Sequence, residues 1–280
     1  MTDYTPPVAL TIAGSDSGGG AGLQADLRTF AALGVFGTTA ITAVTAQNTT
    51  GVRRVDILPA EAVTAQILAV LDDLPVAAVK TGMLADAATV DAVADLAADG
   101  RLPNLVVDPV MVASSGAVLA SDSVVDAYRR RLLRLASVVT PNVPEAAVLV
   151  GATGADAADQ TVLARVLGER IGTTVVVKGG HATGLLCAEV VWHEGEIQIL
   201  ERPRLETGNT HGSGCTFAAA VAAGLCSGAD VLRAVDAAGD FVHAALRGGS
   251  GWTLGAGPGP LDHFGWSAAA VGTAPAETQR

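Results

Sequence analysis

Residues 8–26 read VALTIAGSDSGGGAGLQAD. The apolar run at 8–13 has the length and composition of a buried strand, and the glycine-rich turn that follows leads into a helix. The glycines are not followed by a Lys-Ser or Lys-Thr pair, which excludes a Walker A loop, and their spacing is not that of a dinucleotide site. The segment therefore predicts a strand, a turn and a helix, the repeating unit of an α/β fold.

The same alternation continues along the chain, which is typical of a parallel sheet covered by helices on both faces. Further strands are predicted at residues 39–45, 76–81, 105–110, 138–140 and 173–178, and a β-hairpin at 187–193 and 196–201. Helices are predicted from Pro59 and at 86–98, 121–136, 218–224 and 231–246. We expect a single domain over residues 1–267 and a disordered tail over 268–280, which is small, polar and aperiodic.

A second glycine-rich loop, NTHGSGCT at residues 209–216, runs directly into the apolar helical segment FAAAVAAG. Gly212 and Gly214 allow the backbone to turn its N–H groups toward a ligand, and the first helical turn adds unpaired donors and the positive end of the helix dipole. The loop therefore predicts a site for a phosphate group. Cys215 lies where the loop becomes a helix, a position that lowers a thiol pKa. The simpler alternative is a packing cysteine at a glycine-rich helix start.

Composition narrows the class of protein. With 280 residues, half of them apolar and 16% charged, the chain can bury a large core. Its apolar stretches are too short to span a bilayer and its N-terminus has no signal-like core, so we expect a cytoplasmic protein without membrane association. The three cysteines form no C-x-x-C pair, which disfavours a zinc site or a disulfide framework. A formal net charge of −11 disfavours nucleic acid as a partner.

The two glycine-rich segments together resemble the signature regions of the hydroxymethylpyrimidine/phosphomethylpyrimidine kinases, the thiamine-pathway members of the ribokinase superfamily. Shorter motifs between them follow the order of that family: AQNT at 46–49, KTGML at 80–84, DPVM at 108–111, TPNVPEA at 140–146 and KGGH at 178–181. The resemblance runs from about residue 8 to residue 266. It implies a ribokinase-like three-layer α/β fold, a homodimer, and ATP-dependent phosphorylation of 4-amino-5-hydroxymethyl-2-methylpyrimidine and then of its monophosphate.

Most of these motifs follow a predicted strand, so the carboxyl ends of the strands can bring them to one cleft. Gln47 can donate and accept hydrogen bonds, which suits the edge of an aminopyrimidine. Met83 and Val110 can sandwich the ring, although Met83 taken alone is more typical of an ordinary core residue. By resemblance, the pyrimidine site also includes Gly14 and Asp26.

Two acidic residues are candidate ligands of Mg²⁺, a hard cation that prefers oxygen: Asp108 and Glu145. The alternative for Glu145 is an acid favoured by the dipole at a helix N-terminus. The resemblance implies that the ATP site consists of Lys178, Asn142, Thr210 and His211.

Phosphoryl transfer asks mainly for positioning and charge neutralisation. The resemblance assigns catalysis to the loop formed by Gly212, Ser213, Gly214 and Cys215, where most ribokinase relatives carry an aspartate base in place of the cysteine. We expect Cys215, as a thiolate or as a hydrogen-bond acceptor, to orient the substrate hydroxyl and to take its proton. Two alternatives stay open: a pyridoxal kinase, which shares the fold and the Gly-x-Gly-Cys loop, and a catalytically silent protein that binds vitamin precursors or nucleotide.

Overall fold

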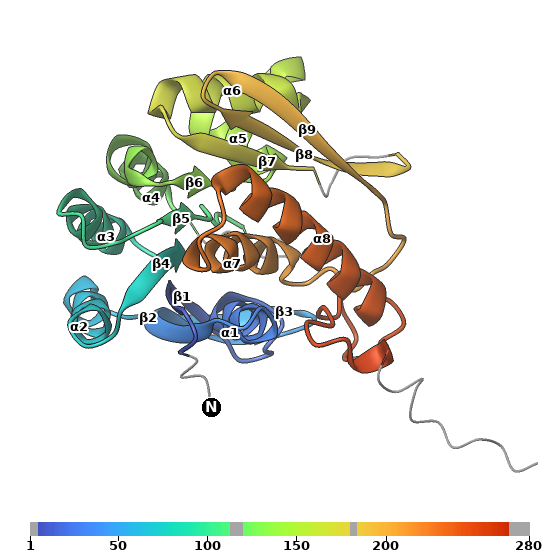
Figure 1. Cartoon of the computed structure of the whole chain (residues 1–280), viewed down its shortest axis with the longest axis horizontal. Helices are drawn as coiled ribbons and strands as arrows, with labels where there is room; N and C mark the ends of the chain where they lie inside the picture. The colour runs from blue at the N-terminus through green and yellow to red at the C-terminus, as the bar shows by residue number, and fades with distance from the viewer. Residues whose placement is uncertain (1–4, 113–119, 180–183, 269–280) are drawn as a thin grey trace, which may run out of the picture.

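The computed structural model describes residues 5–112, 120–179 and 184–268 (Figure 1). In these residues the strands form one nine-stranded sheet in the order β3-β2-β1-β4-β5-β6-β7-β8-β9. Neighbouring strands from β2 to β7 are parallel, whereas β3, β8 and β9 join through antiparallel pairs. The strands are β1 Val8–Asp16, β2 Phe36–Asn48, β3 Gly51–Ile57, β4 Val76–Thr81, β5 Val106–Val107, β6 Val138–Val139, β7 Thr174–Lys178, β8 Leu186–His193 and β9 Glu196–Pro203.

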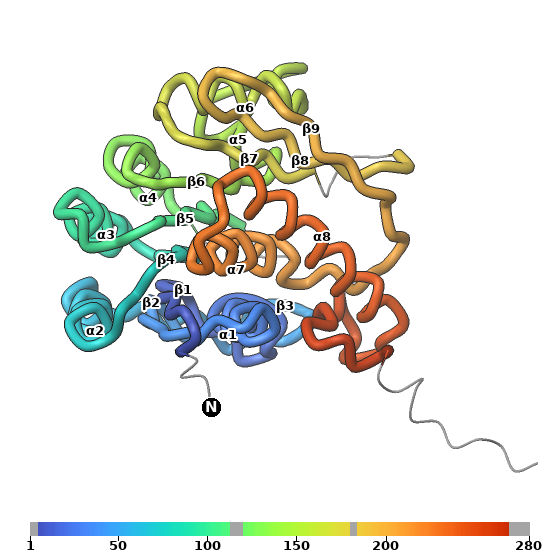
Figure 2. Tube along the Cα trace, viewed as in Figure 1, coloured from blue at the N-terminus to red at the C-terminus, as the bar shows by residue number. Residues whose placement is uncertain are grey.

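Helices cover both faces of the sheet, which gives three layers (Figures 1 and 2). One hydrophobic core lies between the sheet and α2 to α6, and contains the buried Ile67 and Tyr128. The other lies under α1, α7 and α8, and contains Phe30 and Val221. The helices are α1 Gly22–Ala32, α2 Ala60–Leu71, α3 Ala87–Ala98, α4 Asp122–Ala127, α5 Val143–Val150, α6 Gln160–Ile171, α7 Ser213–Cys226 and α8 Val231–Gly249.

Local signals in the sequence explain several element ends. The Asp86 carboxylate accepts a hydrogen bond of 2.7 Å from the backbone N–H of Thr89 and so caps α3. Glu194 and Gly195 have φ values of 49° and 91°, as a tight two-residue turn between β8 and β9 requires. The predicted alternation of strands and helices, the hairpin, and the strand at residues 76–81 are therefore confirmed.

Several elements differ from the prediction: the helix predicted at 218–224 spans Ser213–Cys226, the strand predicted at 39–45 spans Phe36–Asn48, and three further differences have a local cause. Residues 51–57 form β3, an edge strand whose mostly exposed side chains lack an apolar pattern. The strand predicted at 105–110 is limited to Val106–Val107, since Pro109 has no N–H for a sheet hydrogen bond. The helix predicted at 121–136 is an α-helix only to Ala127 and continues as a π-helix, Tyr128–Leu132, and a 3₁₀-helix, Leu133–Leu135. Apolar spacing does not separate these helix types over single turns.

In the parts of the chain that are described, no helix is both long enough and apolar enough to cross a membrane. Except for Ala268, the predicted tail lies outside the described residues, as do Gly180 and His181 of the KGGH motif.

Candidate active site

A cavity of about 650 Å³ opens at the carboxyl ends of the parallel strands, where the strand order had placed the motifs. Its walls come from the ends of β1, β2 and β4 to β7 and from the start of α7. Every predicted site residue except Asp26 lines it: Gly14, Gln47, Met83, Asp108, Val110, Asn142, Glu145, Lys178, Thr210, His211, Gly212, Ser213, Gly214 and Cys215.

The loop at the start of α7 has the geometry of an anion site. Gly212 precedes the helix with a φ of 86°, a left-handed conformation that glycine adopts without strain. The first helical hydrogen bond, 2.9 Å long, runs from the N–H of Thr216 to the carbonyl of Gly212. The N–H groups of Gly214 and Cys215 precede this bond and have no acceptor within the helix. A Cβ on Gly214 would lie 3.2 Å from Lys178 Nζ. An ammonium group and a helix N-terminus therefore face the same space.

Two buried carboxylates face this ammonium group. Lys178 Nζ lies 2.7 Å from Asp108 Oδ1. Glu145 Oε2 accepts a hydrogen bond of 2.8 Å from the backbone N–H of Asn142, completing a capping box at the start of α5. Burial raises the pKa of Glu145 to about 7; the Lys178 ammonium opposes this rise and the Asp108 carboxylate adds to it. Glu145 is thus both a helix cap and a cavity acid, and the cluster has two acids for one base.

Asp26 does not lie where the resemblance placed it. Its side chain is fully buried behind the cavity wall, where its two oxygens are 3.0 and 2.9 Å from Lys80 Nζ. Thr11 Oγ1 donates a third hydrogen bond, 2.6 Å long. A buried ammonium needs a partner of opposite charge, and the cavity is lined by Lys80 rather than by Asp26. Asp26 therefore contacts the lysine that lines the cavity and does not line the cavity itself.

The predicted lowering of the Cys215 pKa is wrong. Burial raises the pKa of this thiol to about 11; the Lys80 ammonium partly opposes the rise, and the Asp26 and Asp108 carboxylates add to it. The favourable effect of the helix N-terminus is smaller than the cost of desolvating a thiolate. Cys215 is therefore a neutral thiol near pH 7.

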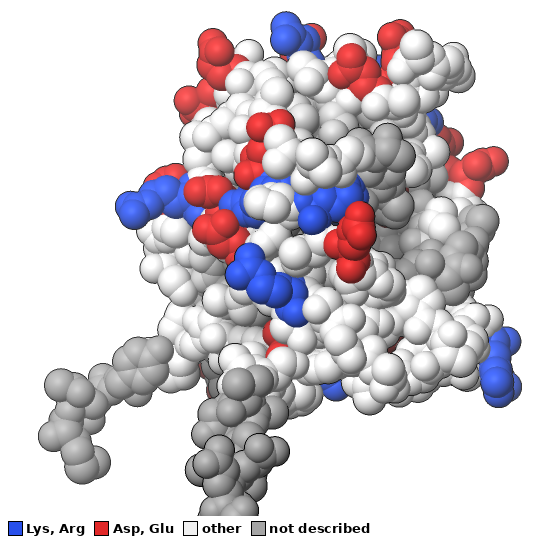
Figure 3. Space-filling model, turned by 90° about the vertical axis from the view of Figure 1, so that its right-hand side faces the viewer, with Lys and Arg blue, Asp and Glu red and all other residues white. Residues whose placement is uncertain are grey.

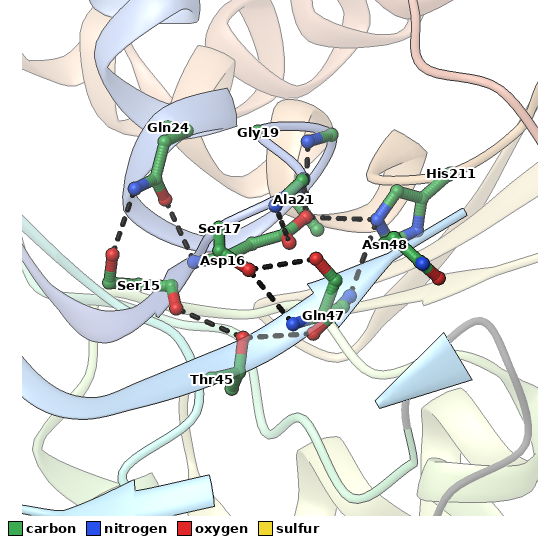
Figure 4. Close-up of polar contacts among 12 residues, drawn as sticks. Ser15, Asp16, Ser17, Gly19, Ala21, Gln24, Thr45, Gln47, Asn48 and His211 are labelled. Atoms are coloured by element: carbon green, nitrogen blue, oxygen red, sulfur yellow. Dashed lines mark hydrogen bonds and ion pairs between the residues drawn. The ribbon is translucent and has the colours of Figure 1, made fainter. Parts of the chain in front are cut away.

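The side chain of His211 lies on the Gln47 side of the cavity (Figure 4). Its Nε2 atom is 3.0 Å from Asp16 Oδ2 and 3.4 Å from Gln47 Nε2. Asp16, in the N-terminal glycine-rich turn, was not selected from the sequence. The signal that could have identified it is an acid within a run of glycines, where backbone N–H groups need an acceptor.

The far end of the cavity adds residues that the motifs did not contain: Arg202, Gly239, Val242, His243 and Leu246. Arg202 of β9 pairs with Glu189 of β8 at 3.2 Å, and with Asp236 and Asp240 of α8 at 2.6 and 2.9 Å. A Cβ on Gly239 would lie 2.4 Å from Arg202 Nη1, so this ion-pair cluster fastens α8 to the hairpin. The face shown in Figure 3 likewise carries basic and acidic side chains next to one another. The sequence signal that could have pointed to this end of the cavity is Gly239, a glycine inside a predicted helix.

The family model described as phosphomethylpyrimidine kinase matches residues 16–262. The chain belongs to this family. It is 49% identical over 259 residues to the hydroxymethylpyrimidine/phosphomethylpyrimidine kinase of Synechococcus elongatus, which covers 92% of this chain and 97% of that protein. The family predicted from the motifs is therefore confirmed.

Solved structures show the same fold. The pyridoxal kinase of Staphylococcus aureus in complex with AMP-PCP and pyridoxal has a TM-score of 0.84 at 31% identity, covering 94% of this chain and 95% of that one. The phosphomethylpyrimidine kinase of Clostridium difficile has a TM-score of 0.74 at 34% identity, covering 85% and 99%. These similarities confirm the predicted ribokinase-like α/β fold.

The buried pair of Asp26 and Lys80 predicts a stability effect. Asp26→Asn keeps the shape of the side chain but leaves the ammonium group uncompensated, which should cost about 3–5 kcal/mol of unfolding free energy. Urea denaturation measures the loss. The double variant Asp26→Asn/Lys80→Met removes both charges and should recover much of the stability. Equal stability of the single variant and the unmodified protein would contradict this role.

The pKa of Cys215 predicts its reactivity. In a Cys187→Ser/Cys226→Ser background, the rate of alkylation by iodoacetamide should rise about tenfold per pH unit between about pH 7 and 10, because only the thiolate reacts. A free cysteine, with a pKa of about 8.5, is the control, and its rate levels off within this range. A plateau for Cys215 below about pH 9 would show that the protein stabilises the thiolate.

Proposed function

We propose that this chain transfers the γ-phosphoryl group of ATP to the hydroxymethyl oxygen of 4-amino-5-hydroxymethyl-2-methylpyrimidine, and then to the resulting monophosphate, to give the diphosphate used in thiamine synthesis. The observation that carries the proposal is the meeting, in one cavity, of the glycine-rich start of α7, the Lys178 ammonium and the Gln47 amide. The family and the names of its members support this substrate class.

Binding of the phosphates is assigned to the anion loop. The N–H groups of Gly214 and Cys215 and the helix dipole favour negative charge, and the Lys178 ammonium adjoins Gly214. These donors are in place before the ligand arrives, so they neutralise the transferring group without reorganisation. Asn142 and Thr210 line the same cavity and are assigned to ATP, whereas the side chain of His211, which was predicted with them, lies beside Gln47.

Mg²⁺ is assigned to Asp108 and Glu145. Both carboxylates are buried and line the cavity, where they face the single Lys178 ammonium group. Such an oxygen set suits Mg²⁺, which is bound by one or two carboxylates together with waters and substrate phosphates. When bound, the ion supplies neutralisation of phosphate charge.

Substrate positioning is assigned to a second set of lining residues. Gly14, Gln47, Met83 and Val110 line the cavity, with Asp26 acting through Lys80. A Cβ on Gly14 would lie 2.5 Å from the terminal carbon of Met83, so the absence of a side chain leaves that position to methionine. Cys215, a neutral thiol, orients the substrate hydroxyl and does not serve as a preformed base. A loose transition state does not require such a base.

Association and location complete the proposal. We assign the chain to the cytoplasm as a single-domain subunit of a homodimer. Support for association comes from large apolar side chains that are exposed along β2 and β3: Phe36, Val44, Val55 and Ile57. Analytical ultracentrifugation would show a monomer if this part of the proposal is wrong.

The test of function is ATP consumption with three acceptors side by side: the pyrimidine alcohol, its monophosphate, and pyridoxal. We expect turnover with the first two to exceed turnover with pyridoxal. Preference for pyridoxal would instead favour the second candidate, a pyridoxal kinase. The structural match to the Staphylococcus aureus enzyme supports this candidate. No ATP consumption with any acceptor, by folded protein, would overturn the kinase assignment.

Gln47 should affect one substrate only. Gln47→Ala removes hydrogen bonds to the pyrimidine, so its KM should rise about 10- to 100-fold while the KM for ATP stays within about twofold. Steady-state kinetics with each substrate varied in turn measures the split. Equal increases for both substrates would make Gln47 a structural residue.

Gly214 should affect turnover without affecting folding. A valine side chain would enter the space beside Lys178 Nζ, where the phosphate is assigned, so Gly214→Val should lower kcat by about 100-fold or more. The thermal unfolding midpoint should change little, because the nearest atom is the flexible end of a lysine. Gly251→Ala, whose added Cβ meets no atom within 4 Å, is the matched control. Near-normal turnover of Gly214→Val would remove the phosphate from this loop.

A further inference from the structure

The amide of Gln47 lies between Thr45 and His211 at the cavity wall (Figure 4). In the orientation drawn, Gln47 Oε1 is 3.2 Å from Thr45 Oγ1, and Gln47 Nε2 is 3.4 Å from His211 Nε2. A half-turn about the last side-chain bond exchanges oxygen and nitrogen and leaves the shape unchanged. The two neighbours therefore decide which orientation is stable.

Thr45 favours the nitrogen of the amide. Its hydroxyl has a single hydrogen, and Oγ1 lies 3.1 Å from the carbonyl oxygen of Ser15, a group that can only accept. With that hydrogen directed to Ser15, the hydroxyl can act toward Gln47 only as an acceptor. The amide group that matches it is NH₂.

His211 favours the oxygen of the amide, and Asp16 is the reason. The Asp16 carboxylate accepts hydrogen bonds from the backbone N–H groups of Gly18, Gly20 and Ala21, at 2.8, 3.0 and 2.9 Å. Burial works to raise the pKa of Asp16, but the hydrogen bonds from His211, Ala21 and Gly18 lower it overall, so the group is ionised near pH 7. A carboxylate can only accept, hence His211 Nε2 carries a hydrogen.

A second N–H group facing that Nε2–H would be repelled, whereas an amide oxygen can share its hydrogen with Asp16 in a bifurcated bond. The ring has little freedom to avoid the contact. A Cβ on Gly20 would lie 2.2 Å from His211 Cδ2, so the backbone of the glycine-rich turn packs directly on the ring. Both neighbours thus require the orientation opposite to the one drawn.

We infer that Asp16 and His211 are positioning residues for substrate selection: they hold the Gln47 amide with its oxygen toward His211 and its nitrogen toward Thr45. The inference rests on the proposed function for the identity of the substrate. An amide has two acceptor and two donor positions, and the two neighbours use one of each. One acceptor beside His211 and one donor beside Thr45 remain for the ligand.

The remaining pair matches a heteroaromatic ring that has an amino group next to a ring nitrogen. The amino group donates to the amide oxygen on the His211 side, and the ring nitrogen accepts from the amide nitrogen on the Thr45 side. A 4-oxo analogue of the pyrimidine presents a carbonyl oxygen and a ring N–H, the reverse order. It would place oxygen against oxygen and N–H against N–H, which leaves buried polar groups unpaired.

The test compares kcat/KM for the 4-amino pyrimidine alcohol and for its 4-oxo analogue in three forms of the full chain. The unmodified protein should prefer the amino substrate by about 100-fold or more. His211→Leu removes the donor that orients the amide, so either orientation becomes available and the preference should fall about tenfold or more. His211→Gln keeps an N–H donor at the end of a side chain of similar reach and should retain most of the preference. The ratio cancels any loss of activity that both substrates share.

An unchanged ratio in His211→Leu, with both rates lowered together, would overturn the inference and leave His211 a structural residue. Failure of the unmodified, folded protein to phosphorylate the amino substrate would instead overturn the proposed function. A second measurement then still decides the inference. In protein with ¹⁵N-labelled histidine, NMR correlation spectra should show a hydrogen on Nε2 of His211, assigned by its loss in His211→Leu. A ring with its hydrogen on Nδ1 alone would contradict the inference whatever the activity.

Discussion

The active-site region depends on a backbone contact between Gly20 and Gly212. A Cβ on Gly212 would lie 1.9 Å from the carbonyl oxygen of Gly20, so no larger residue fits at this point. The contact joins the N-terminal glycine-rich turn to the loop before α7, although about two thirds of the chain lies between them. The wall with Gln47 and the loop with Cys215 therefore belong to one rigid region, with the His211 ring between them.

Lys80, next to the last residue of β4, and Lys178, the last residue of β7, differ in the number of acids that they face. Lys80 is fully buried and paired with Asp26. Its ammonium group donates hydrogen bonds to both oxygens of that carboxylate. That pair is electrically complete, with Lys80 lining the cavity and Asp26 behind its wall. Lys178 faces Asp108 and Glu145 together, and burial raises the pKa of Glu145 to about 7. This cluster of two acids and one base is the proposed site for Mg²⁺ and the phosphates of ATP.

Cys215 shows how a local rule is overruled by its surroundings. A helix N-terminus stabilises a negative charge by about 0.3–1 kcal/mol. This is less than the roughly 1.4 kcal/mol that corresponds to a change of one pH unit in a pKa. Desolvation and the nearby carboxylates exceed that contribution and raise the thiol pKa to about 11. The raised pKa argues against a ready thiolate, and the proposed role of this residue is therefore to orient the substrate hydroxyl.

The sequence by itself determined the strand and helix alternation, the family, and a set of motif residues that all line the cavity except Asp26, because these are properties of local spacing and of motifs in order. It missed β3, whose exposed side chains lack an apolar pattern, and the far end of the cavity, where Arg202 and Gly239 meet through packing rather than through a motif. Tertiary structure alone placed Asp26 behind the wall, raised the pKa of Cys215, and set Asp16 against His211. The physical reason is common to all three: burial and the charge of neighbours come from residues distant in sequence, and the sheet brings them together only when the chain has folded.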